Sequence, residues 1–317
     1  MSFHSGFVTI IGRPNAGKST LLNALAGEKL AIVSPKPQTT RNRVLGVINA
    51  PKQKGRPGAQ IVLIDTPGVH RAGSSLGRKM MAEVREALNG CDLALVITDA
   101  AKRTETGEDF LLDVMKGTKT PAFLLLNKID LLRGEKRQLL PLIEKYSKLR
   151  EFREVIPISA RKHEGLDLLL DKVIKSLPEG PHYFPEGQIT DQPVRFMAAE
   201  LIREQVLFAT SEEVPHSTTV MIEQFEEGAR LTRIAAVIYC EREGQKRILV
   251  GHRGEMLKKI GTAARIEIER MLGTKVFLEL FVKVRQNWRE SRGFVEELDW
   301  RKQLEHLVRP EIEDKLG

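Results

Sequence analysis

The first 177 residues alternate short apolar runs with amphipathic stretches. The apolar runs, in which successive residues are hydrophobic, are typical of strands that are buried on both faces of a sheet. Helical periodicity between the runs, as at residues 80–88 and 166–177, predicts helices that cover such a sheet. The alternation therefore predicts an α/β domain with a mostly parallel sheet. The runs are residues 7–11, 61–64, 93–97, 122–126 and 155–158.

One pair of strands should run antiparallel. Residues 44–49 and 60–64 have strand patterns, and the polar segment between them, residues 51–58, contains two prolines and two glycines. Such a segment is too short for the crossover connection that parallel neighbours need. We therefore expect a β-hairpin here, which brings the predicted sheet to six strands.

A cluster of prolines ends this first pattern. Four prolines lie within sixteen residues, from Pro178 to Pro193, and such a segment is typical of a semi-rigid spacer. The patterns after it run helix, strand, strand, helix, helix, strand, which predicts an α+β domain. The predicted segments are a first domain at 1–177, a linker at 178–194, a second domain at 195–290, and a C-terminal extension at 291–317 without an assigned function.

The net charge narrows the class of partner. Fifty Lys and Arg residues against 42 Asp and Glu residues give a net charge of +8, and the isoelectric point is about 9.4. A folded chain this basic favours a polyanion, either nucleic acid or an anionic membrane surface. The longest apolar runs have about five residues, far below the ~20 that span a bilayer. Peripheral contact at the inner face of the cell membrane stays open, although no strong amphipathic anchor is found.

The two cysteines and the N-terminus indicate the compartment. Cys91 and Cys240 lie far apart, so they suggest neither a disulfide framework nor a zinc site. The first six residues lack the basic start and apolar stretch of a secretory signal. We therefore expect a reducing, cytoplasmic location.

A phosphate-binding segment follows the first predicted strand. Residues 12–19 have the spacing of a P-loop, in which glycines allow a tight turn before a helix begins. Backbone N–H groups of such a loop surround phosphates, Lys18 supplies positive charge to the β and γ oxygens, and Ser19 binds Mg²⁺. The residues predicted to form this site are Gly12, Arg13, Pro14, Asn15, Ala16, Gly17, Lys18, Ser19 and Thr20.

Three further segments, at the carboxyl ends of predicted strands, indicate that the base is guanine. The Asp130 carboxylate can accept hydrogen bonds from N1–H and the 2-amino group of guanine, whereas adenine has neither donor there. A site built for these donors rejects other bases strongly. Asp65 can hold a water molecule bound to Mg²⁺, and Ala160 can direct a backbone N–H at guanine O6. The predicted residues are Asp65, Thr66, Pro67, Gly68, Val69, Asn127, Lys128, Asp130, Ser159 and Ala160.

Two loops bear on the hydrolysis of GTP. Thr40, or its neighbour Thr39, precedes the second strand, where a hydroxyl can complete the ligand shell of Mg²⁺. Val69 stands where Ras-type GTPases carry the glutamine that orients the attacking water, so intrinsic turnover should be slow. We expect no catalytic role for His70, an exposed loop residue. The predicted catalytic residues are Lys18, Thr40 and Gly68.

These motifs together resemble the translation-factor-related bacterial GTPases. Within that group, residues 38–41 and 189–196 are similar to the Era family, and the likeness runs from about residue 6 to about residue 290. The resemblance implies a GTPase of 30S ribosomal subunit assembly whose C-terminal domain binds the single-stranded 3′ end of 16S rRNA. It also implies that Asn15 ligates K⁺ beside the phosphates.

The second domain contains a short motif typical of RNA binding. Residues 251–254 form a G-x-x-G turn, which in K-homology (KH) domains joins two helices and holds about four single-stranded nucleotides. The order of elements is that of the bacterial, type II KH fold. Residues 251–289 carry nine basic and four acidic side chains, which is a local surplus of positive charge. The predicted RNA-binding residues are Ile248 and Val250, lining an aliphatic groove, with Gly251, His252, Arg253, Gly254, Lys258 and Lys259.

Other functions are less consistent with the residues. Aromatic residues are only 5% of the chain, so the base-stacking sheet surface of an RRM or OB domain is not expected. The favoured function is a GTP-hydrolysing switch that binds and releases RNA as a monomer. An RNA adaptor that binds GTP with negligible turnover stays an alternative because of Val69. A P-loop kinase or ATPase is disfavoured by Asp130.

Overall fold

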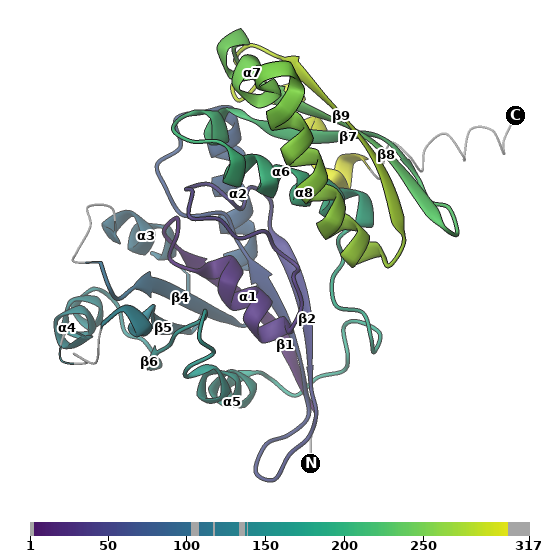
Figure 1. Ribbon diagram of the computed structural model, residues 1–317. Coiled ribbons are helices and arrows are strands. Elements are labelled where there is room, and N and C mark those ends of the chain that lie inside the picture. Colours follow the sequence, from purple (N-terminus) through teal and green to yellow (C-terminus); the bar gives the residue numbers. More distant parts are fainter. Residues whose placement is uncertain (1–2, 103–107, 117, 133–136, 138, 304–317) are drawn as a thin grey trace, which may run out of the picture. The chain divides into compact units, whose positions relative to one another are not determined.

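A six-stranded sheet forms the first part of the computed structural model, which describes residues 3–102, 108–116, 118–132, 137 and 139–303. The strand order is β2-β3-β1-β4-β5-β6 (Figure 1). All neighbours are parallel except β2 and β3, which form the expected hairpin. The predicted mostly parallel sheet is therefore confirmed. Its strands are β1 (His4–Gly12), β2 (Val44–Ala50), β3 (Ala59–Asp65), β4 (Leu93–Asp99), β5 (Ala122–Asn127) and β6 (Glu154–Pro157).

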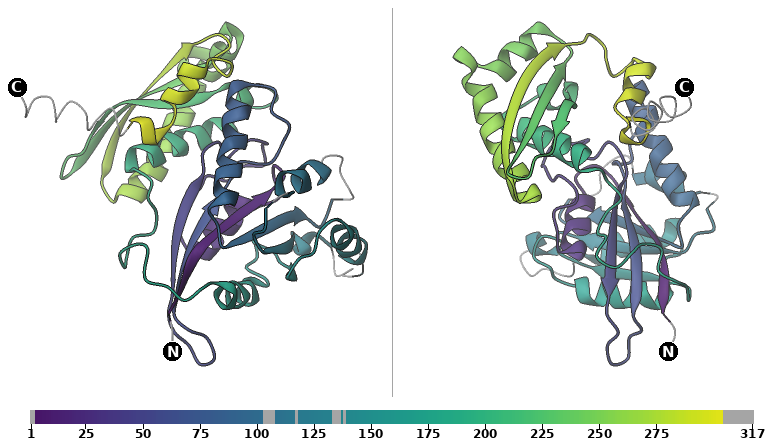
Figure 2. Two further views of the ribbon diagram at one scale, coloured as in Figure 1. Left: turned by 180° about the vertical axis from the view of Figure 1, so that it is seen from behind. Right: turned by 90° about the vertical axis from the view of Figure 1, so that its right-hand side faces the viewer.

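Helices cover both faces of this sheet, as its apolar strands require. On one face, Leu22 and Leu169 belong to a buried cluster with residues of β1 and β3. On the other face, Val84, Met115 and Tyr146 pack with β4 and β5. Figure 2 shows helices on both faces of the sheet. In sheets covered by helices on both faces, ligands bind at the carboxyl ends of the strands. The helices are α1 (Lys18–Ala26), α2 (Ser75–Asn89), α3 (Glu108–Met115), α4 (Leu139–Leu149) and α5 (Leu166–Ser176), with a 3₁₀ turn η1 (Ile129–Leu132).

The proline-rich segment after α5 is bound to the sheet. The Oε1 atom of the fully buried Gln60, on β3, accepts hydrogen bonds from the backbone N–H groups of Tyr183 (2.7 Å) and Phe184 (2.9 Å). Further along, the Val47 N–H donates to the Ile189 carbonyl at 2.9 Å. The segment therefore runs beside the sheet, where its prolines alone predicted a spacer. The reason is tertiary, because the partners lie more than 120 residues away in sequence.

The second unit has the predicted order helix, strand, strand, helix, helix, strand. In its sheet, β8 pairs antiparallel with β7 and parallel with β9. The described chain divides into two compact units at Asp191, and the short segment Ala72–Lys79 groups with the second. The elements are α6 (Val194–Ala209), η3 (Val214–Ser217), β7 (Thr219–Glu226), β8 (Leu231–Cys240), α7 (Glu243–Val250), η4 (His252–Gly254), α8 (Glu255–Leu272), β9 (Lys275–Val284) and α9 (Arg292–Glu297).

The chain after β9 packs onto the second unit. Trp288 is fully buried, and its indole N–H donates to the Ser217 carbonyl at 2.8 Å. Phe294 of α9 meets the Tyr239 ring edge-on, with 5.1 Å between the ring centroids. Of the predicted extension 291–317, residues 304–317 lie outside the described residues. Among the residues that are described, no helix has the length and apolar character needed to cross a membrane.

Candidate functional site

The P-loop connects β1 to α1. The strand ends at Gly12 and the helix begins at Lys18. Asn15 and Gly17 have φ values of +63° and +102°, which close the turn within this short distance. A Cβ atom on Gly17 would lie 2.2 Å from the Asn127 side chain, so this position needs glycine for space as well as for conformation.

Lys18 points into the loop that precedes it. Its Nζ atom donates to the carbonyl groups of Gly12 (3.2 Å) and Arg13 (3.0 Å), and only 6% of the residue is exposed. Burial lowers the pKa of Lys18 to about 8, although the Asp65 carboxylate works in the opposite direction. The loop therefore holds an ammonium group away from water, where its attraction for phosphate is weakly screened.

Three oxygen-bearing side chains meet beside Lys18. The Ser19 hydroxyl donates to the Asp65 carboxylate at 2.6 Å and lies 2.8 Å from the Thr40 hydroxyl, which donates to the same carboxylate oxygen at 3.3 Å. Oδ1, the second oxygen of Asp65, is buried and has no hydrogen-bond partner among the described residues. Hard oxygen ligands with an unused carboxylate lone pair fit Mg²⁺.

Burial also changes the acidity of this carboxylate. Asp65 is fully buried, and the lost hydration raises its pKa to about 6, against the opposing effects of Lys18 and the two hydroxyl groups. A divalent cation at these oxygens would favour the ionised form.

The loop before β2 presents one of its two threonines to this cluster. Thr40 lies against Ser19 and Asp65, whereas the Thr39 hydroxyl donates to the Lys36 carbonyl at 2.7 Å. The Asn15 amide donates to the Pro35 carbonyl at 2.7 Å and so connects this loop to the P-loop. Of the two threonines considered from the sequence, the geometry therefore favours Thr40 as the ligand.

The loop after β3 passes close to the P-loop. A Cβ atom on Gly68 would lie 2.8 Å from the Pro14 nitrogen, and the Val69 N–H donates to the Gly12 carbonyl at 3.0 Å. The Val69 side chain is buried in the core, so it cannot orient a water molecule. His70 is half-buried, and not exposed as expected from the sequence, because its ring lies against its own loop, with Nδ1 2.7 Å from the Gly68 carbonyl oxygen.

The residues predicted to read the base are brought together at the ends of β5 and β6. The Asn127 amide donates to the Ala16 carbonyl at 2.8 Å, and its oxygen accepts from the Ala160 N–H at 3.0 Å. The Ser159 hydroxyl donates to the Asp130 carboxylate at 2.7 Å. Asn127 therefore joins the P-loop to the base-binding loops, and the Asp130 carboxylate is held in position before a base arrives.

Two residues of this site were not among the predicted ones. Asp99 accepts from the Lys128 ammonium group at 2.6 Å, and it ends β4 just as Asp65 ends β3. Its place at the carboxyl end of a strand was a signal that sequence reasoning could have used. The Asn23 side chain accepts from the N–H groups of Leu30 (3.0 Å) and Ala31 (2.9 Å), and no pattern in the sequence indicates this role.

The G-x-x-G turn of the second unit joins α7 to α8. Gly251 and Gly254 have φ values of +73° and +84°, and Arg253 between them has a φ of +50°. A Cβ atom on Gly251 would lie 2.8 Å from the Met256 nitrogen. The side chains of His252 and Arg253 are exposed, so the turn presents its backbone and two basic residues to solvent.

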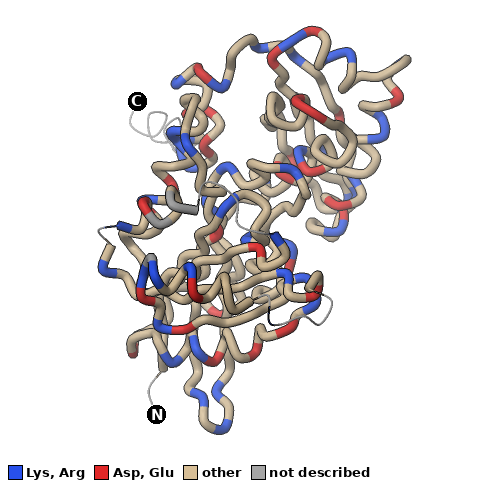
Figure 3. The backbone as a smooth tube through the Cα atoms, turned by 90° about the vertical axis from the view of Figure 1, so that its left-hand side faces the viewer, with Lys and Arg blue, Asp and Glu red and all other residues tan. Residues whose placement is uncertain are grey.

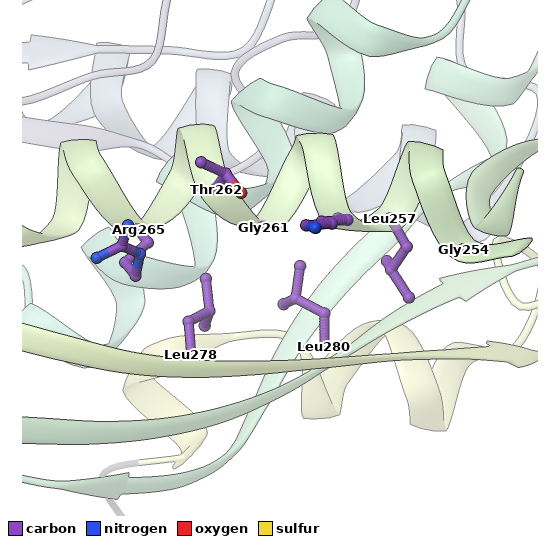
Figure 4. A pocket seen from close by; sticks show the side chains of 8 residues that line it. Gly254, Leu257, Gly261, Thr262, Arg265, Leu278 and Leu280 are labelled. Atoms are coloured by element: carbon purple, nitrogen blue, oxygen red, sulfur yellow. The ribbon is translucent and has the colours of Figure 1, made fainter.

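A groove of about 320 Å³ begins at this turn and runs between α8 and β9 (Figure 4). Leu278 and Leu280 point from β9 towards α8, from which Leu257 and Arg265 approach (Figure 4). A Cβ atom on Gly261 would meet the Leu280 side chain at 3.2 Å, so a small residue keeps the groove open. The lining residues are Gly254, Leu257, Lys258, Gly261, Thr262, Arg265, Leu278 and Leu280.

The groove is aliphatic, and its leucines are not the residues singled out from the sequence for RNA binding. Ile248 and Val250 are not among its lining residues, whereas Lys258 is, and Lys259 is exposed nearby on α8. Leu278 and Leu280 belong to the strand after α8, which carries them back beside the turn. Alternation along that strand could have identified them as a pair on one face.

Comparisons with protein families match both units. The family model described as a 50S ribosome-binding GTPase matches residues 7–128, and the family model of the KH domain matches residues 213–289. The GTPase Era of Geobacter metallireducens is 50% identical over 300 residues, covering 94% of this chain and 98% of that protein. The GTPase Era of Ruminiclostridium cellulolyticum is 47% identical over 302 residues, with coverages of 95% and 99%.

Two solved structures are similar over nearly the whole chain. One is an Era variant from Aquifex aeolicus bound to GDP and AlF₄⁻, with a TM-score of 0.86, 41% identity and coverages of 92% and 98%. The other is Era in complex with MgGDPNP and nucleotides 1506–1542 of 16S ribosomal RNA, with a TM-score of 0.87, 41% identity and coverages of 93% and 98%.

Proposed function

The chain belongs to the Era family of GTPases, and from this premise we propose that it binds the single-stranded 3′ end of 16S rRNA when GTP is bound and acts in 30S subunit assembly. Hydrolysis of GTP to GDP and phosphate, with Mg²⁺, is the activity of the family. This activity of the family argues against the alternative of an RNA adaptor that binds GTP with negligible turnover. Peripheral contact with an anionic membrane surface stays a prediction.

The first unit would bind GTP through the P-loop and the base-reading loops. Lys18 would exchange its two carbonyl partners for oxygens of the β- and γ-phosphates. Asp130, held by Ser159, would accept from the guanine N1–H and 2-amino group, and Ala160 would donate to O6. Asn127 would keep these loops together through its bonds to Ala16 and Ala160.

Ser19, Thr40 and Asp65 would hold the metal. Mg²⁺, when bound, would neutralise charge on the phosphates as the bond to the γ-phosphorus breaks. Thr40, whose hydroxyl already lies 2.8 Å from that of Ser19, would complete the ligands of Mg²⁺ when GTP is bound, and release of its loop after hydrolysis would make that loop a switch. The support is the convergence of the three side chains within 3.3 Å and the unused buried oxygen of Asp65.

Hydrolysis would proceed without a glutamine. Because Val69 is buried, water would be oriented by the backbone near Gly68, which already lies against Pro14 of the P-loop. The side-chain oxygen of Asn15, whose amide group is bonded to the Pro35 carbonyl, would be a ligand for K⁺. A cation there would add positive charge beside the phosphates, where Ras-type enzymes use an arginine.

The observation that carries RNA binding is the leucine-lined groove that begins at the G-x-x-G turn. The exposed backbone of Gly251 to Gly254 would approach phosphates, with Lys258 and Lys259 supplying charge. Unstacked bases would lie against Leu278 and Leu280. The G-x-x-G turn of KH domains holds single-stranded nucleotides, so the RNA proposed for this groove is a single strand.

The test is the affinity for a short RNA that matches the 3′ end of 16S rRNA, compared with a scrambled strand. Each strand is measured at one salt concentration with a non-hydrolysable GTP analogue and with GDP. We expect tighter binding of the matched strand in the GTP state. His252→Asp combined with Arg253→Asp should abolish this binding, whereas Arg270→Asp, an exposed change on α8, should have a much smaller effect. Equal binding of both strands in both states would refute the proposal.

A further inference from the structure

The second unit has a local surplus of positive charge at residues 251–289, but most of the net charge of the chain lies outside this unit. Residues 192–317 contain 21 basic and 21 acidic residues, whereas residues 1–191 contain 29 and 21. Because Arg78 and Lys79 group with the second unit, six of the eight surplus charges belong to the GTP-binding unit. GTP and Mg²⁺ account for the basic residues of the nucleotide site, but not for those elsewhere on this unit.

One part of that surplus lies on the hairpin between β2 and β3. Residues 51–58, which we call the basic hairpin, contain Lys52, Lys54 and Arg56, and no acidic residue occurs from residue 29 to residue 64. The hairpin extends from the amino end of β3, and its tip is marked by basic residues (Figure 3). Asp65 of the nucleotide site ends the same seven-residue strand, roughly 20 Å away. The hairpin therefore cannot serve the nucleotide.

The tip has a defined conformation. Gln53 and Arg56 exchange two backbone hydrogen bonds, of 3.0 and 3.1 Å, around Gly55, whose φ is +82°. The Arg56 guanidinium is largely buried and pairs with Asp171 of α5 at 2.8 Å, which fixes the hairpin to the body of the unit. Lys52 and Lys54 are exposed, and no hydrogen bond or ion pair holds them within the described part of the chain. Two free ammonium groups are thus carried on an ordered turn.

We propose that the basic hairpin is a second RNA contact, in which Lys52 and Lys54 bind phosphate oxygens of folded 16S rRNA. The proposal rests on the proposed function, since it adds a backbone contact to the single strand held in the groove. The tip has no aromatic or large aliphatic side chain, and such residues dominate the energetic centres of protein–protein interfaces. Lysines without neighbouring apolar residues are suited to phosphate, which needs charge and little shape.

The experiment measures binding of the full chain, with a GTP analogue, to protein-free 16S rRNA and to the short 3′ strand at several salt concentrations. The test variant is Lys52→Gln plus Lys54→Gln. The matched control, Lys145→Gln plus Lys148→Gln, removes the same charge from α4. For the test variant on 16S rRNA, we expect the slope of log K against log salt to become shallower by about two. Its affinity should fall about tenfold or more at 0.1 M salt.

The two RNAs separate this proposal from the function on which it rests. Unchanged binding of the short strand by the test variant, with weakened binding of 16S rRNA, would support the hairpin contact. An unchanged slope, or an equal loss in the control variant, would overturn it. If the unmodified chain bound 16S rRNA but not the short strand, the groove assignment would fail while the hairpin result still stood.

Discussion

Gly251 and Gly254 occupy the same turn but for different reasons. Gly254 lies in the left-handed region (φ +84°, ψ +7°), which costs an L-residue roughly 1–2 kcal/mol, whereas Gly251 (φ +73°, ψ 179°) has an extended conformation that is essentially confined to glycine. Only at Gly251 would an added Cβ atom also meet backbone, since it would lie 2.8 Å from the Met256 nitrogen, whereas the space at Gly254 is open. An added side chain at Gly251 would therefore meet both conformational strain and a steric clash, whereas at Gly254 it would meet conformational strain alone.

Alanine substitutions at the two positions should differ accordingly. Gly251→Ala is expected to displace the start of α8 and to weaken RNA binding by more than about tenfold. Gly254→Ala should cost only the conformational strain of roughly 1–2 kcal/mol. Thermal unfolding together with RNA affinity would test this comparison. Equal effects of the two changes on stability and on RNA affinity would contradict this distinction between the two glycines.

Asp130 should determine which nucleotide the site selects. Asp130→Asn replaces a carboxylate acceptor by an amide that can donate, so it should match the 2-oxo group of xanthine in place of the 2-amino group of guanine. We expect the ratio of kcat/KM values for GTP and xanthosine triphosphate to shift by roughly 10²- to 10⁴-fold. Asp167→Asn, an exposed change on α5, is the control and should leave the ratio unaltered. Retained GTP selectivity in the Asp130 variant would contradict the assignment.

At the scale of elements, one buried amide determines the course of the segment after α5. Gln60 also donates to the Phe184 carbonyl and to the Asn49 side chain, both at 2.9 Å. Gln60→Ala would leave these buried groups without partners and should lower the free energy of unfolding by about 2–4 kcal/mol. Urea unfolding would measure the loss of stability. Faster protease cleavage within residues 178–191 would show that this segment has been released from the sheet. Gln188→Ala, which removes only a bond to Thr190, should have little effect.

The junction of α8 and β9 should be sensitive to acid. The Val276 N–H, with help from Lys275 and Arg265, holds the pKa of Glu269 below its ordinary value. A pKa lower in the folded state stabilises the fold above about pH 4.3, and this contribution is lost as pH falls through the folded-state pKa. The melting temperature of Glu269→Gln should therefore lie below that of the unmodified chain at pH 7 and approach it near pH 3. Glu279→Gln, an exposed change on β9, should not show this dependence; a constant gap in the Glu269 variant would disprove the assignment.

At the scale of the molecule, the two compact units should respond to different ligands. A ligand at one hundred times its dissociation constant stabilises the unit that binds it by about 2.7 kcal/mol. For a unit of this size, that corresponds to a rise in melting temperature of roughly 5–10 °C. A GTP analogue with Mg²⁺ should raise the melting temperature of the first unit, and the short RNA should raise that of the second unit. Calorimetry with and without EDTA tests both; a single transition moved equally by either ligand would show that the units unfold together.

The sequence by itself determined the elements, the nucleotide class and the RNA-binding fold. Strand and helix patterns depend on residues within about ten positions, and so do the P-loop and the G-x-x-G turn. The charge asymmetry was also present in the sequence, because counting residues requires no coordinates. The base-reading residues were found because parallel strands bring their carboxyl ends to one edge.

Tertiary structure alone decided which side chains meet. It placed Thr40, and not Thr39, beside Ser19, and it bound residues 178–191 to the sheet through Gln60. It also set Leu278 and Leu280 in the groove at the G-x-x-G turn, which Ile248 and Val250, predicted from the sequence to bind RNA, do not line. The physical reason is common to all three. A contact between residues far apart in sequence depends on how whole elements pack, and that packing is the sum of many small interactions that no local pattern records.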